Sequence, residues 1–387
     1  MLTLVALAAL VSVTAFAQTS VKLMGNIDAG YQSNDYKGNK ISGINNNGSA
    51  TSQIDIEVIE DLGGGLKAKV WLESDINPVA AQANTGFASS IKTGTDAGGG
   101  TWLNSEQKVG LAGNFGEVAV GVVNNKTLAA NGTGQPFGTA IGSGYGSIIK
   151  ASAGVAASTA SVVRADNSIR YDSPVVNGFS GSVYYVAKQS VANGKTNYST
   201  TLGAFNKAGI NEYSLNYANG PVNAIYVIQQ ADYNGVTAPA AVDYNTSTTT
   251  IGVPATVAGT ALTTKSSLKT LSANYTWNAF TFGATTQSLK DDASTNAVNT
   301  KATLGSVKYT MGATMLGLTS GSLTNSVTNT KSTFLGYGAQ YQLSKTTRVY
   351  AQFETLNDDG GTVAAVTGYT EVGTKRTRSG LGVNVAF

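Results

Sequence analysis

The segment RTRSGLGVNVAF, residues 376–387, alternates apolar side chains with polar or small ones and therefore predicts a β-strand. Leu381, Val383 and Val385 fall on one face together with the last residue, a phenylalanine, while arginine, glycine and asparagine fall on the other. A strand left unpaired exposes a row of N–H and C=O groups. The simplest partner is the alternating segment at residues 21–31, and pairing the first strand with the last closes a barrel.

The composition favours strands over helices. Only 12% of the 387 residues are charged, against about a quarter in an average soluble domain, and there are 46 glycines and 18 tyrosines. No apolar run reaches the length of about 20 residues that a membrane-spanning helix needs. A transmembrane barrel, however, faces lipid with only every second residue, so its mean hydropathy stays near zero, as it does here.

Two residue types are missing altogether. The chain contains no histidine and no cysteine, which removes the Ser-His-Asp and Cys-His arrangements and the preferred zinc ligands. We therefore expect no enzyme activity, no cofactor and no metal. The net charge of +3 is small, and the lysines and arginines are scattered along the chain, so no nucleic-acid partner is expected.

The first 17 residues, MLTLVALAALVSVTAFA, form an apolar run that ends in Ala15-Phe16-Ala17. A small residue on either side of one variable residue is typical of a secretory cleavage site. We predict a signal peptide at residues 1–17 and a mature barrel at residues 18–387. The run is short for a membrane helix. No lysine or arginine precedes it, so either the native start lies upstream or the amino group alone supplies the positive charge.

Beyond residue 20 the chain repeats a strand, a long polar segment, a strand and a short turn. This rhythm predicts an all-β, up-and-down antiparallel transmembrane barrel of about sixteen strands, with short periplasmic turns on one rim and long extracellular loops on the other. The predicted strands are residues 20–33, 49–60, 66–76, 103–113, 117–125, 167–173, 178–189, 210–218, 222–232, 267–277, 279–290, 301–310, 313–323, 332–343, 346–357 and 376–387.

Alternation within these strands assigns their two faces. Leu66, Ala68 and Val70 alternate with Lys67 and Lys69, for example. In a membrane barrel the apolar set faces lipid and the polar set faces the lumen. Aromatic residues near strand ends are expected at the membrane interfaces: Tyr31, Tyr185, Tyr275, Trp277, Phe334, Tyr341 and Phe387.

Several motifs resemble the general porins of β-proteobacteria. They are EDLGGGLKA at residues 60–68, VGLAGNFG at 109–116, NSIRYDSP at 167–174 followed by GFSG at 178–181, YANGP at 217–221, LSKT at 343–346 and the terminal Phe387. The resemblance runs through essentially the whole mature chain. It implies a sixteen-stranded homotrimeric outer-membrane channel whose third long loop folds into the lumen, and a role for Phe387 in recognition by the barrel-assembly machinery.

The sequence also departs from that family. Such porins commonly carry arginines where this chain has Gln53 and Glu57, and another near Val122. The acidic, glycine-rich loop motif of the family is matched only loosely by residues 135–138, QPFG. The ion selectivity of the family therefore does not carry over to this chain by resemblance.

The longest connection, residues 126–166, is the expected constriction loop, because structureless loops beyond about 12–15 residues usually carry function. Inward charges of the two signs nearly balance, and this loop adds Lys126, Lys150 and Arg164 against Asp166 alone. A slight positive excess in a narrow passage predicts a weak preference for anions. The expected pore-lining or constriction residues are Lys67, Lys69, Lys108, Arg164, Asp166, Arg170, Arg348 and Arg376.

Three functions are compatible with such a barrel. The first is passive diffusion of small hydrophilic solutes and ions across the outer membrane, with outer-membrane lipid around the barrel. The second is a substrate-specific channel with a saturable site in the lumen. The third is an adhesin or structural envelope protein, which the absence of a passenger domain and of a repeat array disfavours.

Overall fold

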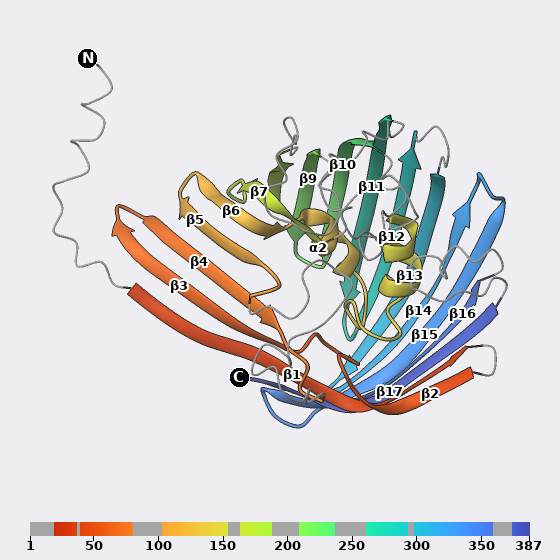
Figure 1. Cartoon of the computed structure of the whole chain (residues 1–387). Helices are drawn as coiled ribbons and strands as arrows, with labels where there is room; N and C mark the ends of the chain where they lie inside the picture. The colour runs from red at the N-terminus through yellow and green to blue at the C-terminus, as the bar shows by residue number, and fades with distance from the viewer. Residues whose placement is uncertain are drawn as a thin grey trace, which may run out of the picture.

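The computed structural model describes residues 19–36, 39–79, 103–153, 163–187, 209–236, 261–292, 298–358 and 374–387, so the predicted signal peptide lies outside the described residues. Nearly everything described belongs to one antiparallel sheet (Figure 1). Its 17 strands are β1 (Thr19–Tyr36), β2 (Asn39–Asn46), β3 (Gln53–Gly63), β4 (Leu66–Asp75), β5 (Gln107–Gly113), β6 (Gly116–Asn124), β7 (Arg164–Asp172), β8 (Phe179–Val186), β9 (Gly209–Asn219), β10 (Val222–Val236), β11 (Ala261–Trp277), β12 (Phe280–Asp291), β13 (Val298–Met311), β14 (Thr314–Asn325), β15 (Thr330–Gln342), β16 (Thr347–Asp358) and β17 (Thr374–Ala386).

The last strand pairs with the first and closes the barrel, as predicted. The register of β1 with β17 runs from Asn26 opposite Ala386 to Tyr36 opposite Arg376. At the seam, the N–H of Gly25 donates to the carbonyl of Phe387 at 3.0 Å, and the N–H of Phe387 returns to Gly25 at 3.1 Å. The Phe387 ring is 54% exposed and occupies the space that a Cβ on Gly25 would need. Glycine at this position therefore makes room for the terminal ring.

Seventeen strands occupy sixteen positions in the barrel, because β2 pairs with the second half of β1 and β3 with the first half. The prediction was wrong here: it made residues 34–48 a long loop and began the next strand at residue 49. Asp28 explains the break. Its carboxylate accepts hydrogen bonds from the backbone N–H groups of Gly48, Ser49 and Ala50, at 2.7, 3.2 and 3.2 Å, so the chain leaves the sheet between β2 and β3.

The two rims differ in the way that was predicted. One rim carries tight turns, in which a left-handed residue reverses the chain. Gly64, Gly116, Gly220, Asn278 and Gly312 have φ values of 61°, 105°, 55°, 52° and 58° at five of these turns. At the other rim the ends of neighbouring strands are farther apart in the sequence, as between β4 and β5, between β6 and β7 and between β10 and β11.

The outer surface of the barrel is apolar and aromatic, as the alternation predicts for a lipid-facing wall. Leu381, Val383 and Val385 are exposed, and so are the interface aromatics Tyr31 and Trp277. Phe334 is the exception among the predicted interface rings. It is only 3% exposed, because it faces inward and is covered by a segment inside the barrel.

Candidate functional site: the barrel lumen

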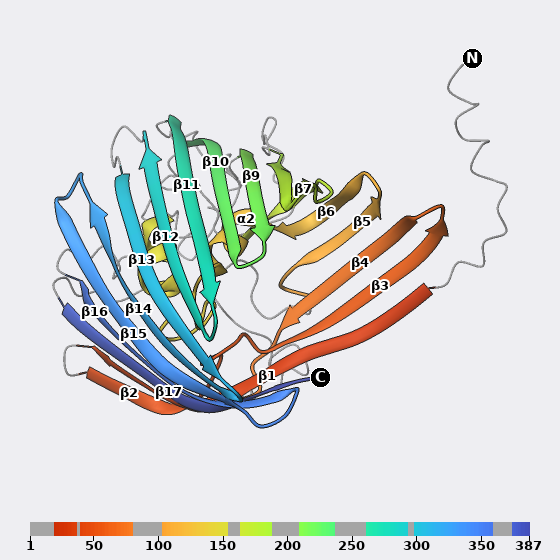
Figure 2. The same cartoon turned by 180° about the vertical axis from the view of Figure 1, so that it is seen from behind.

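Part of the connection between β6 and β7 lies inside the barrel. It contains helix α2 (Lys126–Gly132), the π-helical turn η2 (Tyr145–Ile149) and the short helix α3 (Lys150–Ala153). Both views show these elements, in yellow, within the curve of the green-to-blue strands (Figures 1 and 2). α2 contacts β10 and β11, α3 contacts β12 and β13, and η2 contacts β13, β14 and β15. We call residues 125–153 the infolded segment.

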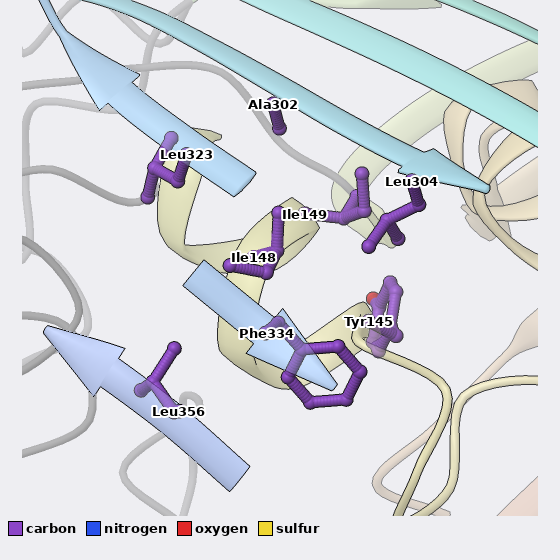
Figure 3. Close-up of a cluster of buried hydrophobic side chains, with 8 residues drawn as sticks. All are labelled: Tyr145, Ile148, Ile149, Ala302, Leu304, Leu323, Phe334 and Leu356. Carbon is purple, nitrogen blue, oxygen red and sulfur yellow. The ribbon is translucent and has the colours of Figure 1, made fainter. Parts of the chain in front are cut away.

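The infolded segment is held first by apolar contact. Ile148 and Ile149 are completely buried, and they pack with Tyr145 against inward-facing side chains of β13–β16 (Figure 3). Those wall residues are Ala302, Leu304, Leu323, Phe334 and Leu356. Burying a side chain of this size contributes about 1.5–3 kcal/mol. The strands carry apolar residues on their inner face here because the segment, rather than water, covers them.

A buried carboxylate holds the beginning of the segment. Glu212, on β9, is 1% exposed. Its oxygens accept from the N–H of Lys126 at 2.6 Å, from the Oγ1 of Thr127 at 2.6 Å and from the Nε2 of Gln229 at 2.9 Å. Asn125 caps the helix through the N–H of Leu128 at 3.0 Å. Glu212 was absent from the sequence-based site, although it alternates with the outward residues Tyr213 and Leu215 and was recognisable as inward.

A second buried carboxylate holds the segment around η2. Glu354, on β16, accepts from the N–H of Gly142 at 2.9 Å and from the Oγ of Ser147 at 3.1 Å. It also pairs with Arg376 at 2.8 Å and with Arg378 at 2.7 Å. The Arg376 side chain is 3% exposed. The expectation that Arg376 lines the open passage is therefore wrong, because Glu354 and the segment bury it.

The opposite wall, formed by β3–β7, carries opposed charges that remain partly exposed. Lys69 pairs with Glu117, and their side chains are 31% and 21% exposed. Lys108 pairs with Glu106 at 3.2 Å. Asp172 is shared by Arg170 at 2.8 Å and by Lys126, from the infolded segment, at 2.9 Å. Lys69, Lys108 and Arg170 thus come together on this wall, each beside a carboxylate.

The other predicted site residues lie elsewhere. Lys67 is exposed near the short turn between β3 and β4, and Arg348 lies close to the turn before β16. Arg164 and Asp166 belong to β7, whereas the prediction placed both in the loop at residues 126–166. The strand begins earlier because Arg164 pairs with Asn124 in the ladder and its Nη1 donates to the Asn124 Oδ1 at 3.2 Å.

Within the described ranges, no three histidine, cysteine, aspartate or glutamate side chains come close enough together to hold a metal ion. None of the helices in the described part of the chain is long and apolar enough to cross a membrane. A closed barrel with an apolar exterior, a charged interior wall and a segment folded into the lumen defines a transmembrane channel protein.

The sequence profile of the Gram-negative porins matches residues 3–361, and the chain belongs to this family. It is an outer-membrane protein, and the family consists of channels rather than enzymes. One relative is outer membrane porin protein 32 of Delftia acidovorans, 31% identical over 229 residues, which are 57% of this chain and 57% of that protein. Another is major outer membrane protein P.IA of Neisseria meningitidis serogroup B (strain ATCC BAA-335 / MC58), 29% identical over 260 residues, with 57% and 59% covered. The matches thus span less than two thirds of these relatives.

Solved structures share the fold. An anion-selective porin from Comamonas acidovorans superposes with a TM-score of 0.71 at 22% identity, covering 96% of this chain and all of that one. The trimer form of OmpT from Vibrio cholerae superposes with a TM-score of 0.62 at 14% identity, covering 95% of this chain and 99% of that one. At these identities the likeness concerns the fold alone.

Proposed function

We propose that this protein is a passive diffusion channel for small hydrophilic solutes and ions, narrowed by the part of residues 126–166 that forms the infolded segment. The observation that carries the proposal is the infolded segment, fixed to the wall at both Glu212 and Glu354. Two separated attachment points and a buried apolar face keep the segment inside the lumen. A fixed narrowing of this kind limits the size of a solute without requiring a bound cofactor or a catalytic group.

The deciding experiment shortens residues 132–154 and measures single-channel conductance in a planar bilayer. Removing material from the lumen widens the passage, so conductance should rise while the barrel still shows heat-modifiable migration on a gel. The control deletes residues of similar number from another long connection, 237–260. An unchanged conductance after the first deletion would contradict a constricting role.

We also propose a weak preference for anions. Support comes from the lysines and arginines of the β3–β7 wall together with Lys126 and Lys150 of the infolded segment. In a narrow passage an excess of one sign enriches ions of the opposite sign. The related protein from Comamonas acidovorans is described as anion-selective, which agrees in direction. Carboxylates of the β3–β7 wall, among them Glu106, Glu117 and Asp172, oppose these cations, so the preference for anions should be small.

Assembly forms a separate part of the proposal. The protein forms homotrimers in outer-membrane lipid, which the trimer form of a similar barrel supports, and Phe387 serves as a signal to the barrel-assembly machinery. Its ring is exposed on the outer face at the closing seam. Phe387→Ser should lower the folded yield, with the conductance of the remaining channels unchanged. Normal trimer yield with altered conductance would contradict the assignment.

Export completes the proposal. Residues 1–17 are removed as a signal peptide, and the mature protein starts at Gln18. N-terminal sequencing of the protein isolated from outer membranes tests this cleavage. Retention of residues 1–17 on the mature protein would contradict it.

A further inference from the structure

The β3–β6 wall contains a hollow of about 270 Å³ that opens into the lumen. Trp71, Glu57 and Lys108 line it together with Lys69, and Gly110 and Ala119 add little bulk. Binding sites for drug-sized molecules start at about 300 Å³. A hollow of this volume therefore suits one small solute rather than an oligomer.

The register of the sheet arranges a charge of each sign around an aromatic ring. Glu57 lies directly opposite Trp71 on the neighbouring strand, and Trp71 lies directly opposite Lys108 on the next strand. One row across the wall therefore reads carboxylate, indole, ammonium. Neighbouring strands lie about 4.7–4.9 Å apart, so the backbones of Glu57 and Lys108 lie about 9–10 Å apart. Their long, flexible side chains can close this gap from both sides on the ammonium and the carboxylate of one α-amino acid.

The indole is held in place before any ligand arrives. Trp71 Nε1 donates to Glu73 Oε2 at 3.2 Å, and Ser105 Oγ donates to the other oxygen of Glu73. The ring can then offer a fixed face. Aromatic faces attract an ammonium group and also stack with flat apolar groups. A positioned ring reduces the entropy lost when a ligand binds.

The Glu57 carboxylate and the Lys108 ammonium can still bind a ligand. Glu57 pairs at 3.2 Å with Lys22, whose side chain is 58% exposed, and such exposed pairs are weak. Lys108 gives one of its three donors to Glu106, which also accepts from the N–H and the Nδ2 of Asn124, at 3.0 and 3.1 Å. A ligand carboxylate can take the remaining ammonium donors without breaking a saturated buried pair.

We propose that this hollow is a binding site for a zwitterionic α-amino acid with an aromatic or large apolar side chain. The ligand carboxylate binds Lys108, its ammonium binds Glu57, and its side chain packs on the Trp71 indole. Lys69 and Glu117 extend the same pattern of charges along the edge of the hollow. The inference rests on the proposed function only in requiring that solutes reach the lumen.

Calorimetric titration of the folded protein in detergent tests the site with three matched probes: L-phenylalanine, L-phenylalaninamide and 3-phenylpropanoate. The zwitterion should bind saturably and at least tenfold more tightly than either singly charged analogue. Glu57→Gln and Lys108→Met should each weaken zwitterion binding about tenfold, and Trp71→Ala should abolish it, whereas Trp71→Phe should retain part of it. Lys308→Met, which removes a lysine from the far wall, is the matched control and should bind like the wild type.

Equal binding of 3-phenylpropanoate would overturn the proposal in favour of a simple anion site. Absence of saturable binding to a folded channel that conducts normally would also overturn it, and would leave the proposed function intact. Failure to conduct would instead count against the proposed function, while the titration in detergent would still decide the site. Heat-modifiable migration of each variant shows that lost binding does not result from lost folding.

Discussion

The two sides of the lumen differ in the kind of side chain that their inner faces carry. On β3–β7 the inner face carries partly exposed ion pairs, such as Lys69 with Glu117 and Arg170 with Asp172. On β10–β16 it carries leucine and phenylalanine side chains that are 1–3% exposed under the infolded segment, such as Leu304 and Phe334. The first wall faces water, and the second wall forms a small hydrophobic core.

This comparison shows that the inside of a membrane barrel is not uniformly polar. Inward residues are polar where they meet water and apolar where protein covers them, because uncovered apolar surface costs about 25 cal/mol per Å². Glu354 on β16 and Arg376 on the neighbouring β17 are covered by the segment, with side chains 1% and 3% exposed, and their pairing satisfies charges that water cannot reach. Charges on the open side have water as a second partner.

The largest effect is expected from a charge in the covered core. Ile149→Asp should lower the free energy of unfolding by about 3–5 kcal/mol if the segment stays in place, since the site is completely buried. Release of the segment would relieve that cost and raise the single-channel conductance. Denaturant unfolding and bilayer recordings measure both. Ile149→Val, expected to cost only about 0.5–1.5 kcal/mol, is the control. Wild-type stability and conductance in Ile149→Asp would show that the infolded segment does not cover a hydrophobic core on this wall.

The next effect concerns the buried ion pair. Glu354→Ala leaves the Arg376 guanidinium buried without its carboxylate, which should cost about 3 kcal/mol. Arg378 is 31% exposed and can turn to water, so it adds little to this cost. Denaturant midpoints measure the loss. The double variant with Arg376→Ala should recover part of it, and a double variant no more stable than Glu354→Ala would argue against pairing as the cause.

A smaller change is expected in ion preference on the open wall. Arg170→Glu replaces a cation beside Asp172 by an anion and should lower the anion-to-cation permeability ratio roughly twofold, because salt at about 0.1 M screens charges beyond about 10 Å. Reversal potentials in a salt gradient measure the ratio. Lys345→Glu makes the same charge change at an exposed short turn and should leave the ratio near the wild-type value. Equal shifts of the permeability ratio in both variants would show that Arg170 does not set the ion preference of the passage.

The smallest effect is the stability change from an open-wall pair. Lys69→Met removes the partner of Glu117, and because both side chains are partly exposed the expected loss is under about 1 kcal/mol. The same denaturant measurement as for Glu354→Ala applies. A loss as large as the one at Glu354 would show that the two walls do not differ in their electrostatics.

Much of the fold could be predicted from the sequence. A period of two separates the faces of each strand, and residues 376–387 already show both a lipid face and a lumen face. Tight-turn residues alternate with long polar segments along the chain. This alternation predicts the number of strands, and it also predicts short turns on one rim and long loops on the other. Closure follows because every strand edge in a membrane must be paired. The inward position of Lys69, Lys108 and Arg170 follows from the same period.

Which inward residues meet water depends on the tertiary structure. The alternation places Phe334 and Arg376 on the inner face of the sheet but does not show whether water or protein covers them. The infolded segment, which is far away in the sequence, covers these two residues. Gln287 shows how distant the contacts are, because its Nε2 donates to the carbonyl of Ile149, 138 residues earlier in the chain. The break after β2 has the same origin, since Asp28 binds backbone N–H groups 20–22 residues later. A local period records the direction of a side chain, whereas burial depends on contacts between distant parts of the chain.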